Sequence, residues 1–366
     1  MDGDASANRF AAWNKGAARA VLALLALLIL AAALVRIEAA PQKVAVKGID
    51  AVAAGSAAPA RPRDDDLQVY DAVIERLKRG ENYYTAAAAE HRRIGFPLRP
   101  GFAVRLPTLA WLEAHLGPTA QMAAAFALFF GVLAAWWRRL GEEPGGAEVR
   151  LIATALLALG MSLAFNRYFF VLHELWAGGL LALSLGLHRP GRRWGGALLA
   201  AALALAIREH ALPFVLLMAA MALWRRDWRE GAAWSLLALV FIAALAWHLA
   251  LVAQQVQSGD PASASWLTFR GLSGWLSAIT LSSNLRLLPH WLAGPAVVLM
   301  LLGWVGWRSP AGLTGTLLFA GYGLLFAVAG RAENYYWGAM VAPAMFIGLA
   351  LAPRALKGLR SAAFSR

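Results

Sequence analysis

The chain has no cysteine among its 366 residues, which excludes disulfides, thiolate zinc sites and iron–sulfur clusters. Charged residues are also scarce, at 15% of the chain against roughly 25% in an average soluble domain. Two nucleotide-binding patterns are missing as well: there is no G-x-x-x-x-G-K-[ST], and no G-x-G-x-x-G lies between a predicted strand and a helix. Nothing therefore points to thiol, iron–sulfur or nucleotide chemistry.

Apolar residues are what the chain has in excess. They make up 60% of it, and the mean hydropathy is +0.55. Long apolar runs recur from Val21 to Leu351, which predicts an all-α polytopic membrane protein with about ten transmembrane helices. Several runs are shorter than the roughly 17 to 20 residues of a span, so they must use polar ends or line a cavity. The predicted spans are 20–37, 119–137, 151–165, 168–187, 194–207, 211–224, 232–253, 287–307, 313–329 and 338–351.

The basic residues predict an orientation. The 34 Lys and Arg outnumber the 21 Asp and Glu, for a formal net charge of +13. They form short clusters between apolar runs, which fits the positive-inside rule and a lipid-bilayer partner better than nucleic acid. We therefore expect both termini in the cytoplasm. The basic connections on that side are 138–150, 188–193, 225–229, 308–310 and 354–366.

A cleaved signal peptide is the alternative for the first run, but the apolar stretch 20–35 exceeds a usual h-region of roughly 7–15 residues. In the following loop, apolar residues at helical spacing predict an amphipathic helix over 64–78. The short run 106–116 is either an interfacial or re-entrant helix or the start of the next span. The predicted parts are a cytoplasmic N-terminus (1–19), a first transmembrane helix (20–37), a periplasmic loop (38–118), a multi-span domain (119–352) and a basic cytoplasmic tail (353–366).

Unusual polar groups occupy every connection on the predicted outer face. Ionisable residues at membrane depth are costly, so they are functional candidates by default. Their convergence on one face is the main functional signal of the sequence. The groups are Asp64 to Asp66; Arg167 with His173 and Glu174; Arg208, Glu209 and His210; Arg270, Asn284, Arg286 and His290; and Arg331, Glu333, Asn334, Tyr335 and Tyr336.

Some of these groups also have a structural interpretation. Carboxylates at a helix start, such as Asp64 to Asp66, can cap free N–H groups and complement the helix dipole. Arg208 and Glu209 could be an internal ion pair that closes a helical hairpin. Tyr335 and Tyr336 could belong to an interfacial aromatic belt.

The pair His173-Glu174 begins like the zinc motif H-E-x-x-H, but the fifth position is Ala177, so that motif is excluded. A buried pair bonded to a neighbouring arginine is the structural alternative. Arginines at a membrane interface suit a phosphate or diphosphate, because guanidinium forks match phosphate oxygens. A carboxylate above them could serve as general base for a hydroxyl. Together these groups predict transfer from a lipid-phosphate donor.

Two short motifs carry a family resemblance. Asp66-Leu67-Gln68-Val69-Tyr70, followed by Gly80-Glu81-Asn82-Tyr83-Tyr84, is similar to a D-L-x-x-Y … G-x-x-Y-Y pattern, and 96–108 is similar to an R-x-P segment before a helix. With its first helix, long outer loop and many spans, the chain resembles the GT-C superfamily of membrane glycosyltransferases. The resemblance implies a polyprenyl-phosphate or polyprenyl-diphosphate sugar donor, and a glycan, lipid or protein acceptor. It also implies a periplasmic active site in a bacterial inner membrane.

The resemblance also implies residue roles. Asp66, or else Asp65, would be the general base, and Arg167, Arg208 and Arg331 would hold the donor phosphate. A transporter or flippase for a lipid-linked or polar substrate is the alternative function, and a non-catalytic scaffold is a third. The sequence leaves open whether a divalent metal takes part. Residues that orient the site or bind substrate would be Tyr70, His173, Glu174, Glu209, His210, Glu333, Asn334 and Tyr336.

Overall fold

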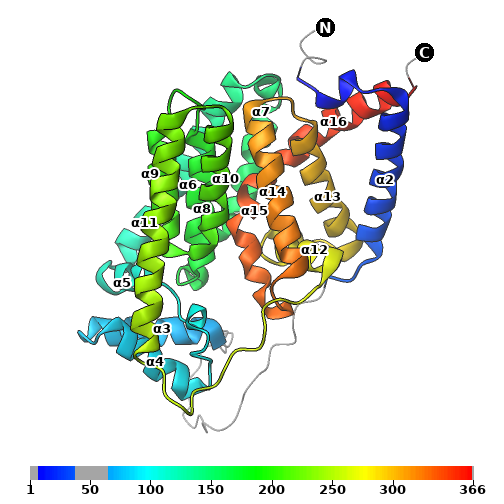
Figure 1. Ribbon diagram of the computed structural model, residues 1–366. Coiled ribbons are helices and arrows are strands. Elements are labelled where there is room, and N and C mark those ends of the chain that lie inside the picture. The colour runs from blue at the N-terminus through cyan, green and yellow to red at the C-terminus, as the bar shows by residue number, and fades with distance from the viewer. Residues whose placement is uncertain (1–6, 38–64, 365–366) are drawn as a thin grey trace.

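A computed structural model describes residues 7–37 and 65–364, which form helices and their connections, with no strand among them (Figure 1). Of Asp65 only the backbone is described, and Asp64 lies outside the described residues. In chain order, with η for 3-10 helices, the elements are η1 (Arg9–Ala12), α2 (Lys15–Leu34), α3 (Asp65–Lys78), α4 (Tyr83–Ile94), η2 (Gly101–Ala103), α5 (Pro107–His115), α6 (Pro118–Glu142), α7 (Gly146–Met161), η3 (Ser162–Phe165), η4 (Arg167–Phe169), α8 (His173–Leu187), α9 (Gly195–Ile207), η5 (Glu209–Ala211), α10 (Leu212–Trp224), α11 (Trp228–Ala253), α12 (Gly271–Leu281), η6 (Asn284–Leu287), α13 (His290–Gly306), α14 (Pro310–Val328), η7 (Ala332–Met340), α15 (Ala342–Met345) and α16 (Ile347–Phe364).

The apolar helices are those of a multi-pass membrane protein. Within the described residues, four helices are long and apolar enough to cross a membrane: α2, α6, α11 and α14. A fifth span results if η7 and the helices after it count as one broken span, bent by 66°. The other apolar runs fold as shorter helices, among them α9, α10, α12 and α13. The structure therefore confirms the prediction of a helical, multi-pass chain. It does not confirm about ten full spans.

Several predicted boundaries differ from the observed ones. The first helix was expected over 20–37 and runs from Lys15 to Leu34, because Asn14 caps it by accepting a hydrogen bond from the Ala17 N–H at 2.8 Å. The run 338–351, expected as one span, is interrupted between Met340 and Ile347. Part of the expected tail is helical, since α16 continues to Phe364.

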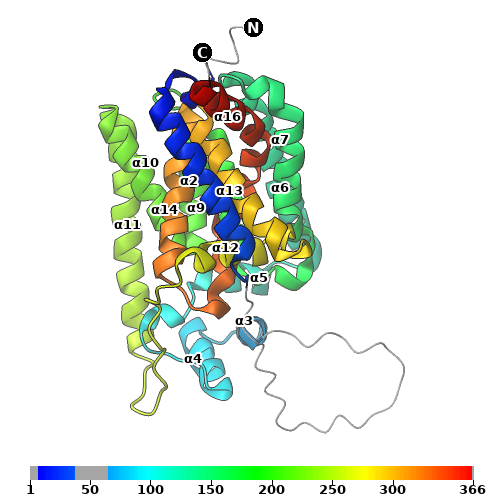
Figure 2. The same ribbon diagram turned by 90° about the vertical axis from the view of Figure 1, so that its right-hand side faces the viewer.

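Small residues let the helices approach closely. A Cβ on Gly303 of α13 would overlap the carbonyl oxygen of Gly348 on α16, and one on Gly348 would overlap that of Met300. Gly294 of α13 meets the backbone of Ala32 on α2 in the same way. Close backbone approach through small residues is the usual packing of membrane helices. It joins α2, α13 and α16 into one unit (Figure 2).

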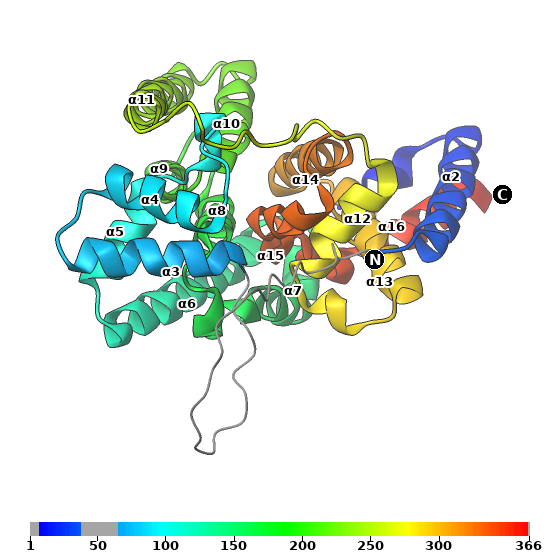
Figure 3. The same cartoon turned by 90° about the horizontal axis from the view of Figure 1, so that it is seen from below.

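The two sets of connections lie at opposite ends of the bundle. At one end, beside both termini, Asn8 donates to the carbonyl of Arg354 at 2.6 Å, and the indole of Trp307 donates to that of Pro144 at 2.8 Å. At the other end, α3, α4 and α5 form a separate layer over the half of the bundle that holds α6, α8 and α9 (Figure 3). The predicted cytoplasmic and outer connections are thus separated in space. Which end faces the cytoplasm stays a prediction.

The α3–α5 layer has its own apolar core. The helix expected over 64–78 is α3, and the side chains of Leu67, Val73, Ile74 and Leu77 on one of its faces are buried. The run 106–116 forms the separate short helix α5, which ends before α6 begins at Pro118. The layer therefore rests on the bundle through apolar contacts of α3 to α5.

Turn residues set the start of α4. Gly80 has a φ of +83°, a left-handed conformation that favours glycine. Asn82 caps α4, since its side-chain oxygen accepts from the Tyr84 N–H at 2.9 Å. Two residues of the Gly80-to-Tyr84 motif therefore have a local structural role. The 254–270 connection is fastened to α4, because Arg92 donates to both carboxylate oxygens of Asp260 at 2.7 and 2.9 Å.

Candidate functional site

Polar side chains from distant segments meet where the α3–α5 layer covers the bundle. They come from α3, the segment before α5, the start of α8, the α9–α10 connection and η7. We call this set the outer polar network; its members are Asp66, Tyr70, Arg105, His173, Glu174, Arg208, Glu209, His210, Asn334 and Tyr336.

One half of the network joins Asp66 to Arg105 through a phenol. The Tyr336 hydroxyl donates to Asp66 Oδ2 at 3.2 Å and accepts from Arg105 Nη2 at 3.0 Å. Arg105 Nε also donates to the Tyr70 hydroxyl at 2.8 Å. The guanidinium carbon lies 5.8 Å from the ring centre of Tyr70 and 5.7 Å from that of Tyr336, within cation–π range. Arg105 is thus held by two phenols, one of which it polarises toward Asp66.

Tyr70 can act in this half of the network only as a neutral phenol. Burial raises the pKa of Tyr70 to about 12, and the charge of Arg105 only partly offsets this. The hydroxyl therefore keeps its proton at neutral pH. It orients Arg105 without balancing its charge.

The other half is a buried ionic chain. Arg208 Nε lies 2.6 Å from Glu174 Oε1, and neither side chain is exposed at all. Arg208 Nη1 also donates to Glu209, whose carboxylate lies 3.2 Å from His210 Nδ1. Arg105 joins the halves, with its Nη2 3.8 Å from Glu174 Oε1. Charges buried this fully persist in proteins only when paired, so each group holds its neighbours in place.

The local backbone explains how Arg208 comes to point inward. The helix α9 ends at Ile207, Arg208 is extended with φ −147° and ψ 119°, and Pro213 stands in the first turn of α10. The hairpin is therefore interrupted at Arg208 rather than closed by a regular turn. The connection is anchored from α14, where the Tyr322 hydroxyl donates to the His210 carbonyl.

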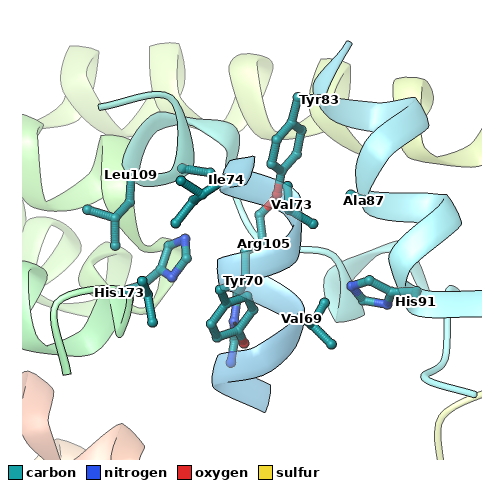
Figure 4. A pocket seen from close by; sticks show the side chains of 12 residues that line it. Val69, Tyr70, Val73, Ile74, Tyr83, Ala87, His91, Arg105, Leu109 and His173 are labelled. Atoms are coloured by element: carbon teal, nitrogen blue, oxygen red, sulfur yellow. Dashed lines mark hydrogen bonds between the residues drawn. The ribbon is translucent and has the colours of Figure 1, made fainter. Parts of the chain in front are cut away.

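A small cavity of about 10 Å³ lies beside the network, with room for about one water molecule (Figure 4). Tyr70, Arg105 and His173 form part of its wall. The His173 ring lies 5.4 Å from the Tyr70 ring, and neither of its nitrogens has a hydrogen-bond partner in the part of the chain that the structure describes. This cavity is too small for a sugar or a lipid phosphate.

Three predicted site residues lie outside the network: Arg167, Arg331 and Glu333. Arg331 lies at its edge: its side chain, 28% exposed, pairs with exposed Glu333 at 2.7 Å, and its backbone N–H donates to Asn334 at 3.1 Å. Arg167 is exposed and acts electrostatically on Glu113 of α5 rather than on the network. The side chain of Asp65 is not described.

Arg105 is the residue that sequence reasoning missed. It was noticed only as the arginine of the R-x-P segment, with no role attached. The signal that could have found it is its position just before the Leu106-Pro107 start of a short helix on the predicted outer face. Its partners Tyr70, Glu174 and Tyr336 are remote in sequence.

The network combines a half-buried carboxylate, Asp66, with fixed guanidinium groups at one end of the bundle. No group of three or more His, Asp and Glu within 7–37 and 65–364 is arranged to hold a metal ion. No protein-family model, no curated protein and no solved structure matches this chain. The resemblance to GT-C enzymes therefore stays a prediction, and the function has to be inferred from the chemistry of these residues.

Proposed function

We propose that the protein is a membrane glycosyltransferase of the GT-C type. It would move a sugar from a polyprenyl-phosphate or polyprenyl-diphosphate carrier to an acceptor hydroxyl at the outer end of the bundle. The observation that carries the proposal is the Asp66–Tyr336–Arg105 connection. The Tyr336 hydroxyl lies between the half-buried carboxylate of Asp66 and the fixed guanidinium of Arg105. General-base catalysis of transfer from a phosphate uses a base and a cation that lie close together.

In the proposed step, Asp66 accepts the proton of the acceptor hydroxyl as its oxygen attacks the anomeric carbon. The bond between that carbon and the phosphate oxygen breaks, and the bonding electrons leave with the (di)phosphate. Guanidinium groups stabilise the negative charge that develops there. The tyrosine between Asp66 and Arg105 positions the base by hydrogen bonding to its carboxylate.

The arginines divide into two roles in this proposal. Arg208 is fully buried and already faces Glu174 and Glu209, so it positions the network and does not touch the donor. Arg331 is partly exposed, and its partner Glu333 is 53% exposed, so a phosphate can displace that carboxylate at little cost. We therefore assign Arg331 to the donor phosphate, whereas Arg105, whose side chain is only 10% exposed, supplies a fixed positive charge behind Tyr336.

The test is transfer of labelled sugar from a polyprenyl-phosphate carrier in membranes that contain the full chain. Asp66→Asn should lower the rate about 10²- to 10⁴-fold, the usual range for loss of a general base. Asp71→Asn is the matched control, because Asp71 is also half-buried on α3 and its charge acts on Glu113 of α5. Full activity in Asp65→Asn/Asp66→Asn at unchanged protein level would overturn the proposal.

The same assay separates a transferase from a flippase. A flippase moves the intact carrier across the membrane, so the bond between sugar and phosphate survives. A transferase releases the carrier phosphate and forms a new glycosidic bond. Movement without bond cleavage would favour the transporter alternative.

A further inference from the structure

A groove opens at the opposite end of the bundle from the outer polar network. Its volume is about 400 Å³, within the usual range for ligand pockets. Helix α8 connects the two ends. It begins at the network with His173, and its 15 residues, at 1.5 Å each, carry it about 22 Å to the groove. We call the groove's small and apolar lining residues, which include Gly131 and Gly195, the floor, and its charged lining residues, Arg138, Glu142, Arg189 and Arg193, the rim.

Glycines keep the floor open. A Cβ on Gly195 would meet nothing within 4 Å, and one on Gly131 would find its nearest neighbour, a Leu183 methyl, at 3.9 Å. Gly186 has the opposite role, since a Cβ there would approach Trp136 at 3.0 Å. Gly186 therefore lets α8 pack closely on α6. Gly131 and Gly195 leave open space in the lining of the groove.

The rim is positively charged. Arg189 Nε donates to Glu142 at 2.5 Å, and its Nη1 donates to the Gly186 carbonyl at 2.8 Å, so this arginine is fixed. Arg138 and Arg193 are exposed and lie on the same rim. Three arginines against one glutamate leave two positive charges at the groove.

The surroundings of the groove are those of a lipid interface. One wall belongs to α6, which is long and apolar enough to cross a membrane. On α6 the side chains of Phe130 and Trp137 are exposed, and the Arg150 guanidinium lies 4.0 Å from the Trp137 ring centre. Tryptophan and arginine together at the end of an apolar helix are typical of the headgroup level of a bilayer.

We propose that this groove binds an anionic phospholipid. Its phosphate is held by Arg138, Arg189 and Arg193, because guanidinium groups pair with phosphate oxygens, and an acyl chain lies on the glycine-rich floor. Basic pockets between membrane helices bind anionic headgroups for these reasons of charge and depth. The site is independent of the proposed transferase chemistry.

The experiment measures thermal unfolding of the purified full chain in detergent while lipid is added. Phosphatidylglycerol should raise the midpoint, whereas phosphatidylcholine and inorganic phosphate should not. In Arg138→Gln/Arg193→Gln, about 10- to 30-fold more phosphatidylglycerol should be needed for the same shift. The matched control is Arg192→Gln/Arg229→Gln, which removes two exposed charges at the same end but outside the groove.

A second variant keeps every charge. Gly195→Leu fills the floor without a backbone clash and should also weaken the phosphatidylglycerol response, whereas Gly321→Leu, at an equally open position on α14, should not. The proposal is overturned by an unchanged response in both groove variants, or by an equal response to phosphatidylcholine. An equal response to inorganic phosphate would also overturn it, because the groove would then be a site for free anions.

Discussion

Glu174 and Arg208 show at the scale of single residues how the outer polar network is maintained. Both side chains are fully buried, 2.6 Å apart, and their charges are balanced only by one another and by groups next to them. Removing one partner of such a pair leaves a buried charge without its counter-ion, which costs more than removing both. The network therefore tolerates paired changes better than single ones.

We expect Glu174→Gln and Arg208→Gln each to lower the free energy of unfolding by about 3–5 kcal/mol. Glu174→Leu/Arg208→Met should lower it by less than the sum of the two single changes. Denaturant unfolding in detergent micelles measures all three. Lys78→Gln is the control, because the Lys78–Glu75 pair is exposed and should contribute no more than about 1 kcal/mol. Strictly additive losses at the buried pair would contradict this interpretation.

Glu113 predicts a pH dependence. Burial, helped by the charge of Asp71, raises the pKa of this carboxyl on α5 to about 7 from its ordinary 4.5. The folded state thus holds the proton more tightly than the unfolded state, so stability is lost as pH rises from about 4.5 through about 7. Glu113→Gln should unfold at a higher temperature than the wild type at pH 8 and at a similar one at pH 4. The exposed Glu75→Gln is the control; equal behaviour of both variants at pH 8 would refute the assignment.

At the scale of elements, backbone contact between α13 and α16 sets the position of the helices around the broken η7–α16 segment. Gly303 faces the carbonyl of Gly348, and Gly348 faces that of Met300; main-chain atoms cannot move aside as a flexible side chain can. The segment also carries Tyr336, which holds Asp66. The contact between α13 and α16 therefore helps to position Tyr336, and through it Asp66.

Gly303→Ala should destabilise the protein by about 1–3 kcal/mol or more, the usual cost of overpacking. Gly321→Ala on α14 is matched in chemistry but meets nothing within 4 Å, so it should be neutral or slightly stabilising. Thermal unfolding of the two variants in the same detergent compares them directly. Tolerance of alanine at Gly303 would show that the α13–α16 contact is looser than described.

At the scale of the whole molecule, polar chemistry is divided between the two ends. The end with the α3–α5 layer carries the outer polar network, and the end with both termini carries the arginine-rimmed groove. If basic connections stay inside, the proposed transferase site faces outward and the lipid groove faces the cytoplasm. One orientation thus assigns each site to its face of the membrane.

The lack of cysteine makes that orientation measurable. Single cysteines at the exposed positions Ser258 and Arg192 report opposite ends. A maleimide that cannot cross membranes should label Ser258→Cys in intact cells but Arg192→Cys only after permeabilisation. The cysteine-free parent chain controls for background labelling. Labelling in the reverse order would invert the topology and move the candidate site to the cytoplasmic face.

Local pattern accounts for what the sequence predicted correctly. Apolar run length indicates membrane helices, and the period of Leu67, Val73, Ile74 and Leu77 indicates the buried face of α3. The Arg clusters likewise assign connections to two sets that the structure places at opposite ends. Each of these signals depends on residues within one helix or one turn.

The tertiary structure decided which polar residues meet. Asp66, Arg105, Glu174 and Tyr336 are far apart in the chain, so no spacing rule could place Arg105 in the network or leave Arg331 at its edge. The tertiary structure also determines the length of the spans, because the run 338–351 is broken after η7 by a bend of 66°. By itself the sequence determined a helical membrane chain with two unlike ends, since hydropathy and charge are local properties. Ion pairing depends on how helices cross, which backbone contacts between small residues determine.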